Sequence, residues 1–239
     1  MPDLTYISKG NSKTECFSFD LPAIDTCPGR TTECERDCYA ANLMRIYKNV
    51  DAKYRRNQEV TYHPGFVDYM VDTIPADCQF RIHVSGDFFH EDYVSKWIEI
   101  ATRRPDVTFY AYTRSWRIPR IWLKVLALTD LPNVNVNLSV DDETGAPNVI
   151  GADALRWCYL TKTDNVPSWI RHDDIVFRSN HVGHKKRRKN AKAKGLPMPT
   201  LVKRLGGQVC PLEQGQDIPN FSCAKCRLCV DKPKVLAHA

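Results

Sequence analysis

The feature that most constrains the fold is an alternation of strand-like and helix-like segments along most of the chain. Apolar residues recur with period two at 79–87, 107–115 and 133–142, a pattern typical of strands. Apolar residues at helical spacing occupy 91–104 and 118–130 between them. Strands separated by helices indicate βαβ units and a parallel sheet. We therefore expect an α/β fold, a complete or partial parallel (βα) barrel of the TIM type with five or six strands.

The alternation extends towards both ends of the chain. Its 239 residues are enough for one large domain. We expect a barrel-like domain over 1–205, with a cysteine loop at 26–40, and a cysteine-rich C-terminal extension over 206–239 packed on it. The remaining predicted elements are strands at 16–23, 156–163 and 174–180, and helices at 39–60, 65–74 and 167–172.

One face of three successive predicted strands is polar, whereas ordinary parallel strands are apolar on both faces. Inside a barrel such a face indicates a ligand cavity, because unpaired polar groups are costly to bury. An antiparallel sheet with one face in water would give the same alternation. Sites in barrels lie at the C-terminal ends of strands, which makes Asp87, Arg114 and Asn137 the candidate catalytic residues. The polar positions are His83, Ser85 and Asp87, then Tyr110, Tyr112 and Arg114, then Asn135, Asn137, Ser139 and Asp141.

Three cysteines follow the first predicted strand, at Cys27, Cys34 and Cys38. The N-terminus has no apolar leader, so we expect the cytoplasm, where disulfides do not persist and clustered cysteines indicate metal. Three thiolates can hold three irons of a [4Fe–4S] cluster and leave the fourth iron open to a small-molecule ligand. Zinc is the alternative, and it would need a fourth ligand from elsewhere, for which His63 and Cys16 are candidates.

A second group of cysteines lies near the C-terminus: Cys210, Cys223, Cys226 and Cys229. The C-x2-C-x2-C spacing is that of ferredoxins and suits a cubane cluster whose irons are all bound by thiolates. Zinc is the alternative here too, because sites of four cysteines commonly hold it. Ligands from both groups could instead share one site, so the sequence predicts one or two clusters.

Together, "CPGRTTECERDCYA" (27–40), "SGDFF" (85–89) and the C-terminal cysteines resemble the phage and plasmid gene product 88 family. The resemblance implies a bacteriophage or mobile-element origin and an iron–sulfur barrel similar to radical S-adenosylmethionine enzymes. "HVSGDFF" resembles the glycine-rich motif of that superfamily, which implies that Ser85, Gly86 and Asp87 bind S-adenosylmethionine. The superfamily's usual loop is C-x3-C-x2-C, whereas the spacing here is six and three, a difference that bears on cofactor cleavage rather than on cluster binding.

A basic run at 184–195 contains seven Lys and Arg residues and no acid. Because the whole chain carries a net charge of +6, the rest of it is close to neutral. The run indicates phosphate contacts to a nucleic acid or, as charge runs usually do, a solvated loop. Its first five cations are Lys185, Lys186, Arg187, Arg188 and Lys189.

The leading hypothesis is an iron–sulfur enzyme of the host-cell cytoplasm, with its open iron at the mouth of the barrel. One version cleaves S-adenosylmethionine to a radical, and another uses the iron as a Lewis acid in carbon–sulfur chemistry, as in a lyase or desulfidase. The alternatives are a nucleic-acid-binding module with structural metal sites and an electron-transfer protein or redox sensor. No membrane partner is expected, since the longest apolar stretch is far short of the ~20 residues of a membrane span.

Overall fold

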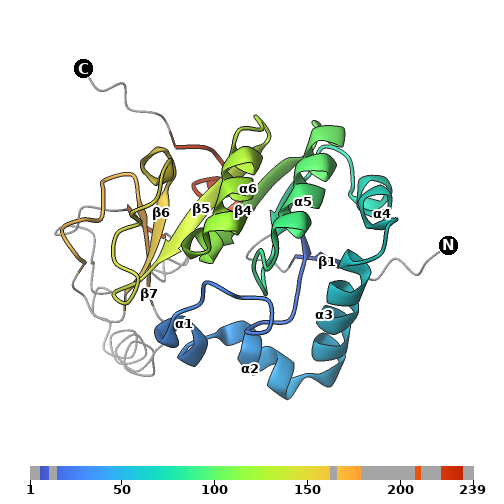
Figure 1. The fold of residues 1–239 in the computed structure, drawn as a ribbon, viewed down its shortest axis with the longest axis horizontal. Helices are drawn as coiled ribbons and strands as arrows, with labels where there is room; N and C mark the ends of the chain where they lie inside the picture. Colours follow the sequence, from blue (N-terminus) through green and yellow to red (C-terminus); the bar gives the residue numbers. More distant parts are fainter. Residues whose placement is uncertain (1–5, 11–14, 162–165, 179–207, 211–221, 234–239) are drawn as a thin grey trace.

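The strands of the computed structural model form one sheet in which neighbours in the sequence are neighbours in space (Figure 1). The structure describes residues 6–10, 15–161, 166–178, 208–210 and 222–233. β1 runs antiparallel to β2, and every later strand pairs in parallel with the one before it. The strands are β1 (Ile7–Lys9), β2 (Phe17–Phe19), β3 (Gln79–Ile82), β4 (Thr108–Thr113), β5 (Val134–Val140), β6 (Trp157–Thr161), β7 (Ile175–Arg178) and β8 (Gln208–Val209).

The expected α/β fold and mostly parallel sheet are confirmed, but a closed barrel is wrong. Among the described residues no pairing joins β1 to β8, so the sheet is open, and its parallel part, β2 to β8, has more than the expected five or six strands. The outermost strands have only three and two residues, which offers little backbone for a closing ladder. The face that would line a barrel is instead covered by chain, as described below.

The helices connect successive strands and follow local signals at several of their ends. Thr31 caps α1 by accepting a hydrogen bond from the Cys34 amide at 3.0 Å, and Pro119 begins α6. The single helix predicted at 39–60 is divided at Tyr47, whose backbone is extended, and no Gly or Pro marks this break. The helix predicted at 167–172 is wrong, because turns occupy this segment. The helices are α1 (Thr32–Arg36), α2 (Tyr39–Ile46), α3 (Lys48–Thr61), α4 (Phe66–Thr73), α5 (Glu91–Arg103), α6 (Pro119–Thr129) and α8 (Cys223–Cys226), with 3₁₀ turns η1 (Ser115–Arg117) and η2 (Ala152–Ala154).

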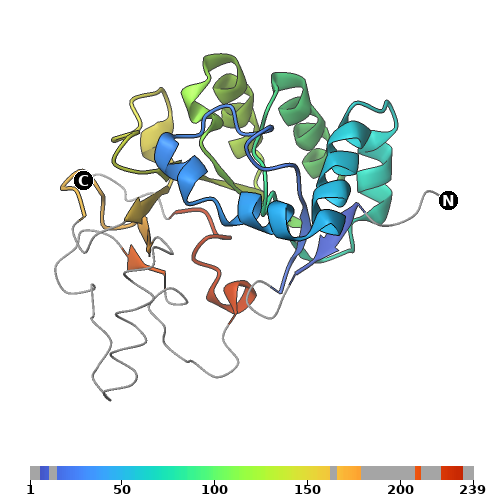
Figure 2. The same cartoon turned by 90° about the horizontal axis from the view of Figure 1, so that it is seen from below.

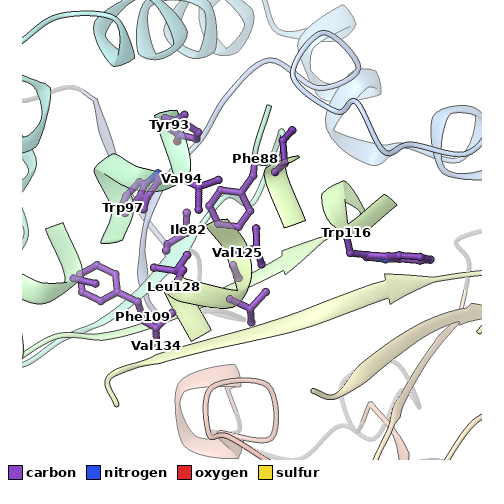
Figure 3. Close-up of a cluster of buried hydrophobic side chains, with 14 of the residues drawn as sticks. Ile82, Phe88, Tyr93, Val94, Trp97, Phe109, Trp116, Val125, Leu128 and Val134 are labelled. Carbon is purple, nitrogen blue, oxygen red and sulfur yellow. The ribbon is translucent and has the colours of Figure 1, made fainter. Parts of the chain in front are cut away.

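The hydrophobic core lies between the apolar face of the sheet and α4, α5 and α6 (Figure 3). Trp97 of α5 is fully buried at its centre, with ring centroids 5.9 Å from Phe80 and 6.2 Å from Phe109. Fully burying an apolar side chain stabilises the fold by about 1.5–3 kcal/mol. The apolar phase of the strands therefore faces the helices, as the alternation predicts. Its buried members include Phe80, Ile82, Phe109, Ala111, Val134, Val136 and Leu138.

The opposite face of the sheet is polar and is covered by residues 222–233, on the other side from α5 and α6 (Figure 2). Ser18, Arg81, Tyr110 and Asn135 are in register across β2 to β5. The side-chain amides of Asn135 and Asn137 donate to the carbonyl oxygen of Cys229 at 2.8 and 2.9 Å. The polar face exists as predicted, but much of it contacts this segment of the same chain.

Candidate functional site

The loop at 26–40 lies across the C-terminal ends of β3 and β4. Gly29 is packed against the backbone of Arg114, and a Cβ at this position would lie 2.0 Å from the Arg114 carbonyl oxygen. Arg117 donates to the Gly29 carbonyl at 3.0 Å, and the Tyr39 hydroxyl donates to the Val84 carbonyl at 2.7 Å. Only glycine fits such a close approach, so the loop is held at the strand ends where a parallel sheet places its sites.

A cavity of about 280 Å³ opens between this loop and the strand ends. All three loop cysteines line it, as do the predicted site residues that follow β3 and β4. Asn137 is not among the lining residues, because it is fully buried on the polar face beneath residues 222–233. The structure therefore brings together seven of the predicted site positions here: Cys27, Cys34, Cys38, Ser85, Gly86, Asp87 and Arg114.

A buried ion pair fixes Arg114 beside the loop. Its guanidinium lies 2.8 Å from the Asp141 carboxylate, with both side chains almost fully buried. The same carboxylate accepts a hydrogen bond from the Thr31 hydroxyl at 2.7 Å, and Thr31 caps the helix that carries Cys34. Arg114 also interacts with the Cys34 thiol and favours its charged form. Strand ends and cysteine loop are thus joined through one charged pair.

Asp87 lies at the base of the cavity and is buried. Its carboxylate accepts hydrogen bonds from the Thr113 hydroxyl at 2.6 Å and from the amides of Phe88 and Arg114 at 2.7 and 2.8 Å. Burial raises the pKa of Asp87 to about 6, although these donors favour the charged form. The carboxylate therefore organises the β3 and β4 ends as well as lining the cavity.

Ser85 and Gly86 join the end of β3 to the chain that follows β2. The Ser85 hydroxyl donates to the Leu21 carbonyl at 2.8 Å. Gly86 has a φ of +83°, and a Cβ there would lie 2.6 Å from the side chains of Leu21 and Thr26. Glycine is needed for both the left-handed backbone and the space. These contacts hold the "SGD" motif between the end of β3 and the chain that follows β2.

The loop thiols have the chemistry of a soft-metal site, and those of Cys27 and Cys34 are protonated as placed. Burial, followed by the charge of Asp87, raises the pKa of Cys27 to about 12. Burial also raises the pKa of Cys34, while Arg114 opposes the shift. Among the described side chains, no three His, Cys, Asp or Glu residues stand close enough together to hold a metal ion. Metal loading would therefore displace protons and draw the thiolates together.

His83 does not follow the polar phase in which the sequence pattern places it. β3 ends at Ile82, and His83 has a φ of +72°, which turns its side chain to the apolar side. Its Nε2 lies 2.8 Å from the Tyr93 hydroxyl, and its ring stacks on that of Tyr93. Burial, followed by the charge of Arg81, lowers its pKa to about 3. No glycine marks this bend, so the pattern gives no sign of it.

The two alternative ligands for the loop lie elsewhere. The His63 ring accepts a hydrogen bond from the Gly65 amide, just after α3. Cys16 is buried with its sulfur 3.1 Å from the Tyr110 hydroxyl. Neither residue lines the cavity of the loop cysteines.

Other predicted features lie apart from this cavity. The four C-terminal cysteines line a second, smaller cavity of about 40 Å³. The basic run, including Lys185, Lys186, Arg187, Arg188 and Lys189, lies outside the described residues, as does the expected domain boundary at 205. In the described part of the chain no helix combines the length and apolar character needed to cross a bilayer.

Comparison with known proteins places the sequence among phage proteins. A family profile described as Gene product 88 matches residues 4–232. The "Gene 88 protein" of Mycobacterium phage L5 is 33% identical over 126 residues, covering 46% of this chain and 53% of that protein. Its counterpart in Mycobacterium phage D29 is 32% identical over 126 residues, with 46% and 52% covered. The chain thus spans about half the length of the curated relatives it matches. No solved structure matches it.

Proposed function

The chain belongs to the Gene product 88 family, and from that premise we propose that it is an iron–sulfur enzyme whose loop cysteines bind a [4Fe–4S] cluster. The observation that supports this proposal most is that Cys27, Cys34 and Cys38 line one cavity with Asp87 and Arg114. Thiolates are the ligands that iron–sulfur clusters prefer, and three of them leave one iron free.

The charged side chains around the cavity indicate the class of ligand. Arg30, Arg81 and Arg114 line it against only two acids, Asp37 and Asp87. Arginine binds carboxylates with paired hydrogen bonds. A small molecule that carries a carboxylate therefore suits this wall, a class that includes amino acids and S-adenosylmethionine.

The chain's own residues would bind and orient that ligand. When bound, the cluster would supply an iron that acts as a Lewis acid or as a source of single electrons. Arg114 is fixed by Asp141, so its guanidinium holds one orientation and loses little freedom on binding an anion. The loop and the strand ends would keep the ligand against the thiolate side of the cavity and restrict the access of water.

Anaerobic reconstitution with iron and sulfide tests the proposal. We expect a triple Cys27→Ser, Cys34→Ser and Cys38→Ser variant to bind about four fewer irons per chain than the wild type. Cys78→Ser is the matched control, because Cys78 lines neither cysteine cavity and its loss leaves the iron count unchanged. Equal iron in the triple variant and the wild type, or zinc without iron in both, would contradict the proposal.

The two chemistries are separated by a second measurement on the reconstituted wild type. Under reducing conditions with S-adenosylmethionine, radical chemistry releases 5′-deoxyadenosine, whereas Lewis-acid chemistry does not.

The Arg114→Lys variant keeps a cation but loses the paired donors, so it should weaken binding of a carboxylate ligand by tenfold or more, as expected for about 1.4 kcal/mol.

A further inference from the structure

The four C-terminal cysteines line one cavity, although Cys210 follows a strand and the other three belong to a separate segment. Cys210 directly follows β8, and its amide donates to the Val176 carbonyl of β7 at 3.1 Å. Cys223, Cys226 and Cys229 come from α8 and the turn after it. All four line the cavity of about 40 Å³, and the rest of its wall includes Arg81, Tyr110 and Tyr112.

The backbone around these cysteines is tightly bent. α8 is one turn long, is capped by the buried Ser222, and is followed by Arg227 with a φ of +55°. The left-handed conformation costs a residue with a Cβ about 1–2 kcal/mol, and such strain persists where the surroundings require it. Here it reverses the chain, so that Cys229 lines the same cavity as Cys223 and Cys226.

The sheet holds this segment almost entirely by its carbonyl groups. Gln79 donates to the Ala224 carbonyl at 3.1 Å and Arg156 to the Asp231 carbonyl at 2.9 Å, in addition to the two asparagine bonds to Cys229. Val230 is the segment's one buried apolar side chain among the described residues. So little apolar burial leaves the segment without the usual source of stability, and a metal bound to thiolates from both β8 and α8 would supply it.

The two groups of cysteines line neighbouring cavities that share two lining residues. Arg81 and Tyr112 line both cavities, whereas no cysteine lines both. From this arrangement we propose that Cys210, Cys223, Cys226 and Cys229 form a second metal site, closed by four thiolates and distinct from the loop site. The C-x2-C-x2-C spacing favours a [4Fe–4S] cluster. In the structure these thiols do not stand close enough together to hold a metal ion. Binding of a cluster would therefore require all four side chains to turn towards it.

This second site does not rest on the proposed function, because it uses none of the loop cysteines. The test is made on the full chain, with all four cysteines of this group changed to Ser and with Cys78→Ser as control. We expect the quadruple variant to bind about four fewer irons per chain than the wild type. The triple loop variant should keep these four irons, which distinguishes failure of one site from failure of the other. An unchanged iron count in the quadruple variant would overturn the proposal, and zinc in place of iron would overturn the cluster.

Amide hydrogen exchange gives a readout that does not depend on activity. In the loaded wild type the amides of residues 222–233 should exchange at least tenfold more slowly than in the quadruple variant, while α5 exchanges equally in both. If α5 also exchanges faster, the variant is misfolded, and the single variant Cys226→Ser replaces it. Equal exchange of residues 222–233 in a well-folded variant would contradict a role for the metal in docking.

A subtler variant tests the site without removing a ligand. Tyr112 lines the same cavity as Cys229, and its hydroxyl interacts with the Cys229 sulfur. Hydrogen bonds to ligating sulfurs set the potential of a cluster, so Tyr112→Phe should lower the reduction potential of the C-terminal cluster alone. Tyr62→Phe is the control, because Tyr62 is exposed and lines neither cysteine cavity. Equal potentials in Tyr112→Phe and the wild type would contradict the assignment of Cys229 as a ligand.

Discussion

Replacing Gly29 with alanine tests whether the cysteine loop is seated on the sheet as the structure shows. Gly29 is not one of the glycines with positive φ, so alanine can adopt its backbone conformation and the effect is purely steric. The added Cβ would lie 2.0 Å from the carbonyl oxygen of Arg114, 2.5 Å from its carbonyl carbon and 2.9 Å from the amide nitrogen of Ser115. These are backbone atoms between β4 and η1, and they cannot rotate away.

The size of the effect follows from that overlap. Ordinary contact begins at 3.4 Å, so the loop and Arg114 must separate by more than an ångström, which weakens the hydrogen bond from Arg117 to the Gly29 carbonyl. Overpacking of this kind costs about 1–3 kcal/mol. In a chain of this size each kcal/mol lowers Tm by about 2–4 °C, so we expect a loss of about 2–12 °C.

Urea titration and thiol labelling measure the two consequences. Gly29→Ala should unfold at lower urea, and Cys27 and Cys34 should react faster with a maleimide because the loop no longer buries them. Gly65→Ala is the control, since a Cβ there meets only the His63 ring, at 3.3 Å, and the change should be close to neutral. If the two variants are equally stable and their thiols react equally fast, the loop is not seated on Arg114.

Three further predictions concern single side chains. Because the folded pKa of His83 is about 3, below its usual value of about 6.5, the unfolded chain takes up a proton first, and stability falls as pH drops through this window. Between about pH 7.5 and about pH 5, the free energy of unfolding of His83→Gln, measured by urea titration, should therefore fall by about 2 kcal/mol less than that of the wild type. An equal dependence of stability on pH in the two proteins would contradict a buried neutral ring. Asp141→Asn leaves the Arg114 charge unpaired in a buried place and should cost about 3–5 kcal/mol, whereas a loss below about 1 kcal/mol would refute the pairing. Trp97→Ala should cost about 3–5 kcal/mol by the same assay, and Leu123→Ala, on an exposed position of α6, should stay within about 0.5 kcal/mol.

Much of the fold could be predicted because its strands and helices alternate with clear periodicity. The apolar phase of β3 to β5 and the helices α4 to α6 follow directly from spacing, since both partners of the core carry the pattern. β1 and β8 were missed because three and two residues cannot show a period. Closure of the sheet depends on curvature and on what covers the polar face, and neither is a local property.

The candidate site divides in the same way. The place of the cysteine loop could be predicted, because it follows a parallel strand and strand ends meet at one edge. Asn137 could not be placed, because the segment it binds lies 92 residues further along the chain. The bend at His83 also had no signal, since it depends on a left-handed residue without glycine. Local patterns therefore indicated which side chains are polar, but not which of these polar side chains would bind another segment of the same chain.

The position of residues 222–233 has a consequence for how the chain folds during synthesis. These residues leave the ribosome after β2 to β7 and α4 to α6, and domains generally fold as they emerge. The apolar core can form while the opposite face of the sheet still meets water, a state that Arg81, Tyr110 and Asn135 tolerate because they are polar. The covering segment can then dock by its carbonyl groups on a finished sheet. Nascent chains arrested before and after residue 233 should thus share one core and differ in the exposure of this face.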